Sequence, residues 1–477
     1  MPAFGTLLAE PLYVLADTAI VGHLGTAELA GLALASTLLL AVHGICIFLA
    51  YGTTSAVSRL LGAGDTRRAM GVAVQSLWLA AVIGTVVGAG LAAAATPLLR
   101  GLGGSGDALV AGRTYLQVAC LGLPFLLMSL AGGGTFHGRQ NARVPLALAV
   151  AGNVANLGLE LALVPGLGYG IGASALATTV VQAGVAVVYT RLVVGWASSP
   201  SSTPEPFTDG TTGGSVGHES ARTDDHPRLF THGTTGGGSV GHEMAGSARG
   251  AGVALRPVPA EMGALLRAGR PLVLRTLSLR AAFTLATAAA ARVGVQAVAA
   301  HQVAIQVWST LGLALDAVAI AGQSLTGRWL GAGAADQARA AARRMVELDV
   351  ALGVVAGALT LMFRRPIAGL FTDDPVLIGL IAYLLVWVAA AEPLNGFVFA
   401  LDGVLIGAGD LAYLGRAMTA VSIAFLAMGA AVIATGAGLG WLWTALTAFM
   451  FLRGVAVWWR WRSGHWLVTG AALPSST

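Results

Sequence analysis

Long apolar segments occupy most of this chain of 477 residues. An α-helix needs about 20 apolar residues to cross a bilayer, and only 10% of the chain is charged, against about 25% in soluble domains. Because backbone groups in hydrocarbon must be bonded within their own segment, such segments favour helices. We predict an all-α, multi-pass membrane protein with spans at 2–22, 30–57, 72–98, 113–136, 144–164, 170–194, 271–291, 299–326, 345–363, 377–403, 413–434 and 439–460.

The two sets of six predicted spans are repeats of one another. A shift of 269 positions lays Arg59–Gly64 on Arg328–Gly333, Arg-Leu-Leu-Gly-Ala-Gly on Arg-Trp-Leu-Gly-Ala-Gly. The same shift, without a gap, pairs Gly25 with Gly294, Pro124 with Pro393, and Gly138 with Gly407. Because six is even, the halves should share one orientation, related by an axis along the membrane normal with a central cavity between them. Polar side chains differ between the halves: Asp17 pairs with Ala286, Glu160 with Gly429, Asn156 with Phe425, Asp316 with Ile47, and Asp402 with Gly133.

Between the halves lies a polar segment rich in Gly, Ser, Thr, Pro and His. Residues 210–219 are nearly duplicated at 233–243, and such a composition cannot bury a core. We therefore predict an N-terminal lobe at 1–196, a disordered linker at 197–262, a C-terminal lobe at 263–464 and a tail at 465–477. Histidines in the linker could hold a metal, but a duplicated solvated tract is the simpler interpretation, and we expect no metal site: His218, His226, His232 and His242.

Arginine counts in the short loops predict the orientation. The loops after the second, fourth, eighth and tenth spans hold ten arginines: Arg59, Arg67, Arg68, Arg139, Arg143, Arg328, Arg339, Arg343, Arg344 and Arg416. The alternate loops hold five: Arg100, Arg113, Arg292, Arg364 and Arg365. Both termini and the linker should therefore be cytoplasmic, in a plasma or inner membrane.

Composition also excludes several functions. All 27 basic residues are arginine, so the lysine of an ATP-binding Walker A loop and a lysine Schiff base are both absent. The basic balance comes from loop arginines and does not indicate nucleic acid. Cys46 and Cys120 are isolated and form no CxxC motif. We expect a transporter rather than an enzyme, without an organic cofactor, acting as a monomer on a small molecule.

Two carboxylates stand inside the first apolar span. Glu10, Tyr13 and Asp17 are spaced i, i+3, i+7, which places them on one helical face. An ionised group at the bilayer centre costs roughly 2.5–3.5 kcal/mol on insertion scales, so this face should look into a cavity or bundle interior. We predict that Asp17 takes up and releases a proton; an acid bonded permanently to neighbouring helices is the alternative.

The fifth span repeats this pattern with Asn153, Asn156 and Glu160. Two amides and a carboxylate on one face can share a proton with Asp17 or bind a desolvated cation. Thr178 and Gln182 on the sixth span could face the same pocket. Helix–helix hydrogen bonding is the alternative interpretation for the amides.

Further charged residues lie inside the second half. Asp316 and Asp402 are lone acids that could attract a cationic substrate, and Arg280 could instead neutralise one of them. Glu392 precedes Pro393 within the tenth span and is a further cavity candidate. Arg275 is expected to extend toward the membrane surface.

Several motifs together point to a known family: Glu10–Gly25, Arg59–Asp65, Asn153–Glu160, Ala299–Gln302, Leu315–Asp316 and Glu392–Asp410. In these the chain resembles the multidrug and toxic compound extrusion (MATE) family, most closely its DinF-type branch. The resemblance implies two six-helix lobes in a V and export coupled to inward flow of H⁺, or of Na⁺ in some members. It also implies that Asp17 is the coupling acid, completed by the Asn-containing fifth helix.

We therefore expect an antiporter that exports cationic or amphiphilic compounds in exchange for H⁺. Na⁺ coupling is one alternative, because Asn153, Asn156 and Glu160 offer oxygen ligands. A flippase for lipid or polysaccharide precursors is another, but it would need cavity arginines, whereas the charge inside the spans is mainly acidic.

Overall fold

The computed structural model describes residues 20–21, 23–198 and 253–471, and all regular structure in these ranges is helical. The elements are α2 (Thr26–Cys46), α3 (Phe48–Gly62), α4 (Thr66–Ala93), α5 (Ala95–Gly101), α6 (Gly106–Gly138), α7 (Arg143–Leu161), a π-helical turn η1 (Ala162–Gly166), α8 (Ile171–Ser198), α9 (Pro259–Val293), α10 (Val295–Gly331), α11 (Ala335–Gly369), α12 (Pro375–Gly407), α13 (Leu411–Thr435) and α14 (Gly438–Ser463). Eleven helical segments in these ranges are long and apolar enough to cross a membrane. They match eleven of the twelve predicted spans, while the predicted first span falls almost wholly outside the described residues.

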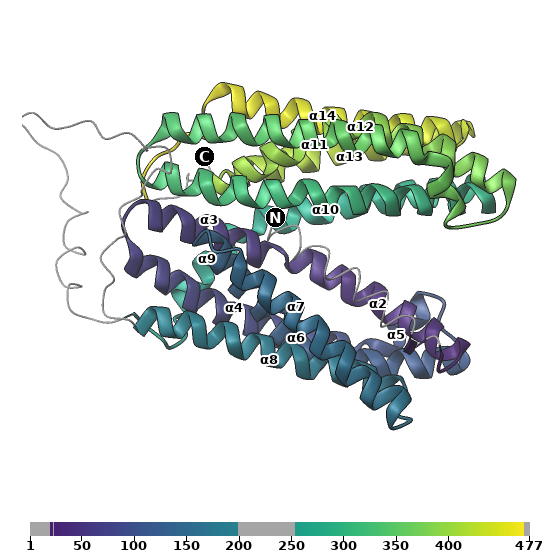
Figure 1. The fold of residues 1–477 in the computed structure, drawn as a ribbon, viewed down its shortest axis with the longest axis horizontal. Helices are drawn as coiled ribbons and strands as arrows, with labels where there is room; N and C mark the ends of the chain where they lie inside the picture. Colours follow the sequence, from purple (N-terminus) through teal and green to yellow (C-terminus); the bar gives the residue numbers. More distant parts are fainter. Residues whose placement is uncertain (1–19, 22, 199–252, 472–477) are drawn as a thin grey trace, which may run out of the picture.

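Two helical bundles share one end of the molecule and diverge toward the other (Figure 1). Three hydrophobic cores follow this shape. One core joins residues of both bundles, from Cys46 at the end of α2 to Trp466 after α14. A second is built by α9–α14 alone, and a third by Val21 with α2, α4, α5, α6 and α8. We call the shared end, where α3, α8, α10 and α14 finish, the closed end.

Backbone angles confirm the predicted repeat. Residues 269 positions apart have matching φ values: 155° at Gly25 and 151° at Gly294, 76° at Gly64 and 79° at Gly333, and 60° at Gln140 and 75° at Gly409. Positive φ is a backbone state that glycine adopts at little steric cost, so these turns explain the shared glycines. Gln140 is the only non-glycine residue with positive φ in the described ranges, and its partner in the repeat is Gly409.

A proline breaks the same helix in both halves. Ala94 separates α4 from α5 with φ −90° and ψ 8°, and its repeat partner Phe363 departs from helical angles within α11 at φ −101° and ψ 15°. Each lies three residues before a proline, Pro97 or Pro366. A proline lacks the N–H that would bond the preceding turn and its ring clashes there, which explains both breaks.

At the closed end the bundles cross at two symmetry-related glycines. A Cβ added to Gly62 at the end of α3 would overlap the backbone carbonyl of Arg328 in α10. The reciprocal Cβ on Gly331 would overlap the carbonyl of Arg59. Because the obstacle is backbone rather than a flexible side chain, neither position has room for a larger residue.

Replacing Gly331 by alanine should therefore open the closed end. The added methyl has no space while α3 and α10 cross, so the bundles must separate there. Spin labels at positions 68 and 336, both exposed, would report a longer distance in Gly331→Ala. Gly52→Ala is the matched control, because no atom lies within 4 Å of a Cβ at Gly52. An unchanged distance distribution in Gly331→Ala would contradict the crossing.

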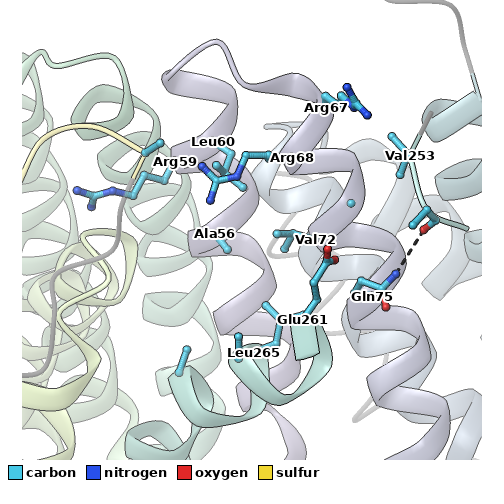
Figure 2. Close-up of a pocket in the computed structure, with 15 residues that line it drawn as sticks. Ala56, Arg59, Leu60, Arg67, Arg68, Val72, Gln75, Val253, Glu261 and Leu265 are labelled. Carbon is cyan, nitrogen blue, oxygen red and sulfur yellow. Dashed lines mark hydrogen bonds between the residues drawn. The ribbon is translucent and has the colours of Figure 1, made fainter. Parts of the chain in front are cut away.

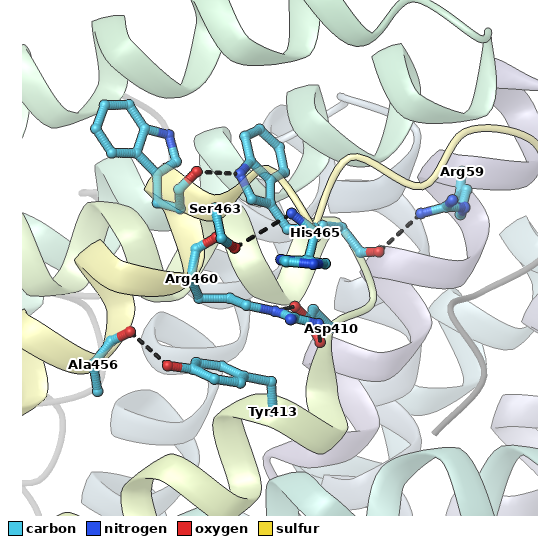
Figure 3. A network of polar contacts seen from close by, with 10 residues as sticks. Arg59, Asp410, Tyr413, Ala456, Arg460, Ser463 and His465 are labelled. Carbon is cyan, nitrogen blue, oxygen red and sulfur yellow. Dashed lines mark hydrogen bonds and ion pairs between the residues drawn. The ribbon is translucent and has the colours of Figure 1, made fainter. Parts of the chain in front are cut away.

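Arg59 of α3 ties the first bundle to the end of the second (Figure 3). Its fully buried guanidinium donates to the carbonyls of Ala408 and Gly470, both at 2.8 Å, and to that of Val468. The Gly470 N–H in turn donates to Leu330 O at 2.9 Å. Residues 464–471 thus form a terminal strap across the closed end.

Arg59→Gln should release the terminal strap. A glutamine cannot satisfy three carbonyls, and each lost hydrogen bond is worth about 1 kcal/mol or more where the acceptor is left buried. Trypsin should then cleave faster after Arg462, which is exposed in the last turn of α14, directly before the strap. Arg68→Gln is the control, since the Arg68 side chain is 69% exposed and its ion pair with Asp65, at 3.7 Å, lies at the surface. Equal cleavage in both variants would show that Arg59 does not hold the strap.

The segment before α9 is bound to the first bundle as well (Figure 2). Gln75 of α4 donates to Ala254 O and Arg256 O at 3.3 and 2.9 Å, and accepts from Val258 N at 2.8 Å. A cavity of about 780 Å³ beside it is lined by residues of α3, α4 and α9. The chain therefore passes over α4 before it enters the second bundle.

Candidate functional site

A central cavity of about 480 Å³ lies between the two bundles. The first bundle contributes Gly44 of α2, Ile47 at the break before α3, and Tyr51 of α3, and the second contributes residues of α9, α10, α12 and α14. Much of the wall is apolar and aromatic, as in sites that bury organic molecules. Phe283 and Trp308 form part of it, with ring centroids 5.4 Å apart.

Asp402 of α12 is neutralised within this cavity wall. Its Oδ2 accepts from Arg275 Nη2 of α9 at 2.6 Å and from Arg453 Nη2 of α14 at 2.7 Å. The expectation that Arg275 extends to the membrane surface was wrong, because its side chain is only 13% exposed. Two cations on one carboxylate leave Asp402 little attraction for a cationic substrate.

Asp316 of α10 joins the bundles through Tyr51. The Tyr51 hydroxyl donates to Asp316 Oδ2 at 3.4 Å, and Gln323 Nε2 donates to the Tyr51 carbonyl at 2.7 Å. Both Asp316 and Tyr51 line the cavity. The repeat partner of Asp316 is Ile47, at the break between α2 and α3. At this position of the repeat, therefore, the second bundle has a carboxylate and the first bundle does not.

Arg280 of α9 lines the same cavity without pairing to either acid. Among the described residues no carboxylate lies within ion-pairing distance of it, so the alternative in which Arg280 neutralises Asp316 or Asp402 is wrong. Its guanidinium lies over Gly44 of α2, where an added Cβ would come within 2.5 Å of Nη2. The glycine leaves room for the arginine between the bundles.

Glu392 lies elsewhere in the second bundle. It is fully buried, accepts from Asn395 Nδ2 at 3.1 Å, and is not part of the central cavity wall. Added Cβ atoms on Gly353 and Gly357 of α11 would meet the Glu392 backbone or its Cβ. Close helix packing, rather than the cavity, surrounds this acid.

In the first bundle, the predicted polar face of α7 meets α8. Asn156 Nδ2 donates to Thr178 Oγ1 at 3.1 Å, and Glu160 is fully buried one turn further on. The Asn156 amide oxygen is buried and accepts no hydrogen bond from the described residues. The π-helical turn η1 begins two residues after Glu160, at Ala162, and contains Pro165. Such turns often mark functional positions in helices.

Asn153 and Gln182 were predicted to share this polar site, but within the described part of the chain they do not join the contact between Asn156 and Thr178. Asn153 is partly exposed on α7. Gln182 turns toward α6, where its Oε1 would be 2.7 Å from a Cβ on Gly122. The three candidate residues of the first span, Glu10, Tyr13 and Asp17, lie outside the described residues. The linker histidines also lie outside them.

Sequence reasoning missed the roles of four polar residues, two in α3 of the first bundle and two in the second bundle. Arg453 and Tyr51 complete the cavity network. Asp349 of α11 is fully buried, and neither carboxylate oxygen has a hydrogen-bond partner in the described ranges. Arg59 was counted with the arginines of the loop after the second span, but it lies in the last turn of α3 and is fully buried. A lone charge inside an apolar segment was the available signal for Arg453 and Asp349.

Known proteins resemble the chain along almost its full length. DNA damage-inducible protein F of Escherichia coli is 27% identical over 478 aligned positions, covering 98% of this chain and 92% of that protein. DETOXIFICATION 44, chloroplastic, of Arabidopsis thaliana is 28% identical over 490 positions, covering 99% and 83%. A solved multidrug resistance MATE family transporter in an outward-facing conformation matches with a TM-score of 0.79 at 20% identity, covering 97% and 93%.

A second solved structure, a MOP superfamily transporter from Pyrococcus furiosus described as having a binding pocket of reverse polarity, has a TM-score of 0.77 at 20% identity, with coverage of 97% and 93%. These two likenesses establish the fold. The MatE family model matches residues 2–162 and 271–439, which is most of both halves and omits the linker. The predicted resemblance and fold class are confirmed: this multi-pass membrane protein belongs to the MatE family of multidrug and toxic-compound efflux transporters and is not an enzyme.

Proposed function

We propose that the protein is a secondary active antiporter that exports amphiphilic organic molecules in exchange for H⁺. The observation that carries the coupling proposal is the buried polar site of the first bundle. Glu160 is fully buried there, beside an Asn156 amide oxygen that accepts no hydrogen bond from the described residues. A buried carboxyl group beside a buried amide oxygen suits a proton or a small cation, because a charged carboxylate in a place of low dielectric constant is costly and either species neutralises it.

The repeat supports placing Asp17 at this site. Its partner Ala286 lies in α9, and the partner of Glu160 is Gly429 in α13. These two helices pack together: Leu285 Cδ2 would be 2.9 Å from a Cβ on Gly429, and Ser278 and Thr419 share a hydrogen bond of 3.2 Å. If the first span packs on α7 as α9 packs on α13, Asp17 faces Glu160.

In this proposal the closed end is cytoplasmic and the diverging end faces outside. Protonation of Asp17 and Glu160 rearranges their network with Asn156, shifts the first span and releases substrate from the outward-facing cavity. The two lobes, 1–196 and 263–464, then rock about the closed end, and the proton leaves to the cytoplasm. Separation of the lobes there requires that Arg59 give up its bonds to the terminal strap.

Vesicles reconstituted with the full chain test the coupling ion. A pH-sensitive dye inside the vesicles would report proton movement when dansylglycine, dansylglycinamide or a dansyl quaternary ammonium compound is added. We expect at least one compound to move protons under an imposed pH gradient in the absence of Na⁺. Transport that needs a Na⁺ gradient and ignores the pH gradient would overturn H⁺ coupling in favour of Na⁺.

Na⁺ coupling stays a second candidate on one specific observation. Asn156 Oδ1 and the Glu160 carboxylate are oxygen ligands in one buried place, as a hard cation requires.

The flippase alternative is affected by the arginines of the central cavity. A mainly acidic cavity was expected, but the cavity wall contains Arg275, Arg280 and Arg453. A lipid pyrophosphate nevertheless carries more negative charge than this cavity wall can balance.

A further inference from the structure

The charges on the described wall of the central cavity do not balance. Three arginines and two aspartates line it: Arg275, Arg280, Arg453, Asp316 and Asp402. Asp402 binds Arg275 and Arg453, and Asp316 accepts from a neutral tyrosine. The wall therefore carries one positive charge in excess, and Arg280 is the arginine in this described wall that no acid pairs.

Arg280 is held where a ligand could reach it. Its side chain is exposed, although it stands in the inner part of a membrane helix and lines a cavity between the bundles. Gly44 of α2 leaves the space across which the guanidinium extends. A cation in a place of low dielectric constant is costly unless it is paired, and a guanidinium offers a planar fork of donors that matches a carboxylate.

The surroundings of Arg280 are aromatic and apolar. Phe283 lies three residues further along α9, on the same helical face, and Trp308 of α10 packs against it. Leu279 and Phe399 also line the cavity. An organic body would thus lie on these side chains while a charged group meets Arg280.

We infer that the central cavity binds amphiphilic monocarboxylates, with the carboxylate on Arg280 and the apolar body against Phe283 and Trp308. A single excess charge matches a monoanion, whereas a cation would be repelled and a pyrophosphate would stay under-neutralised. The inference gives the substrate class for the proposed antiporter and so rests on that function. It replaces the expected cationic substrate with an anionic one.

Equilibrium binding to the full chain in detergent tests this substrate class. Energy transfer from tryptophan to a dansyl group would be titrated with dansylglycine, dansylglycinamide and a dansyl quaternary ammonium compound of similar size. In the native chain the carboxylate should bind about ten- to a hundredfold more tightly than the amide, as expected for a charged hydrogen-bonded pair, and the cation should bind most weakly. Equal or tighter binding of the amide or the cation would overturn the proposal without the need for any variant.

Substitutions locate the carboxylate. Arg280→Gln should remove the preference for dansylglycine over the amide, and Arg280→Lys should restore part of it. Arg364→Gln, which changes an arginine outside the cavity wall, is the matched control and should keep the native preference. A native preference retained in Arg280→Gln would overturn the assignment to Arg280.

Binding and coupling fail separately in these experiments. Dansylglycine binding that depends on Arg280 needs no pH gradient, so it would stand even if proton flux were absent. In that case the proposed antiport is wrong and the cavity ligand is right. Conversely, proton flux driven by the quaternary ammonium compound but not by dansylglycine would leave the antiporter intact and refute the monocarboxylate.

Discussion

Asp402→Asn is expected to destabilise the second bundle by about 3–5 kcal/mol, because it leaves two buried arginines without a negative partner. Arg275 and Arg453 both bond the same carboxylate oxygen, and their side chains are only 13% and 5% exposed. An asparagine keeps the size but not the charge, so the two guanidinium groups would repel each other at close range. The midpoint of thermal unfolding in detergent should fall well below that of the native chain.

Two comparisons separate loss of charge balance from loss of shape. Asp316→Asn is the matched control, because Asp316 accepts one 3.4 Å hydrogen bond from an uncharged tyrosine and should tolerate an amide. The triple variant Arg275→Met, Asp402→Leu, Arg453→Met should recover most of the lost stability, since a buried ion cluster can be exchanged for apolar groups of similar size. Asp402→Asn as stable as Asp316→Asn would refute the account of this cluster.

Proton-driven export should fall about tenfold or more in Glu160→Gln and in Asp17→Asn, which corresponds to loss of a typical coupling free energy. Each amide keeps the shape of the acid but cannot exchange a proton. Glu160 is fully buried in the first bundle, and the repeat supports Asp17 as its neighbour. The measurement is proton flux into vesicles, started by the compound that the native chain transports best.

The control for this experiment is Glu347→Gln. Glu347 forms an exposed pair with Arg344 at 2.8 Å and stands outside both polar sites. Its flux should equal that of the native chain. If Asp17→Asn and Glu160→Gln both retain native flux while the protein remains monodisperse, the first-bundle site has no part in coupling. A loss in one variant alone would assign the coupling acid to that residue.

Local sequence pattern was sufficient for the membrane architecture. Apolar length located eleven described spans, and the constant offset of 269 anticipated matching turns as small as Gly64 and Gly333, whose φ values are 76° and 79°. The i, i+3, i+7 spacing placed Asn156 and Glu160 together on a buried face of α7. These features depend on residues close in the chain, where helical periodicity fixes direction.

The pairing of charges could not be read in the same way. Arg275 is separated from Asp402 by 127 positions, and Arg59 from Gly470 by 411. A pattern within one helix indicates that a charged residue is buried away from lipid. The identity of its partner depends on which helices pack together and on how they are shifted along their axes. For that reason Arg275 was expected at the membrane surface, and Arg59 was counted with the arginines of a short loop.

The order of residues along the chain determines the apolar spans, their repeat and the acidic faces. A bilayer permits few alternatives to helices, and a charge exposed to lipid is costly, so charged residues face the protein interior. Helix packing between the bundles settled the rest. In the packed structure Asp402 forms ion pairs with two arginines, and Arg280 faces the cavity across Gly44. The terminal strap is bound to Arg59. Contacts between distant segments depend on the three-dimensional arrangement, so the net charge of the cavity emerges only once the helices are assembled.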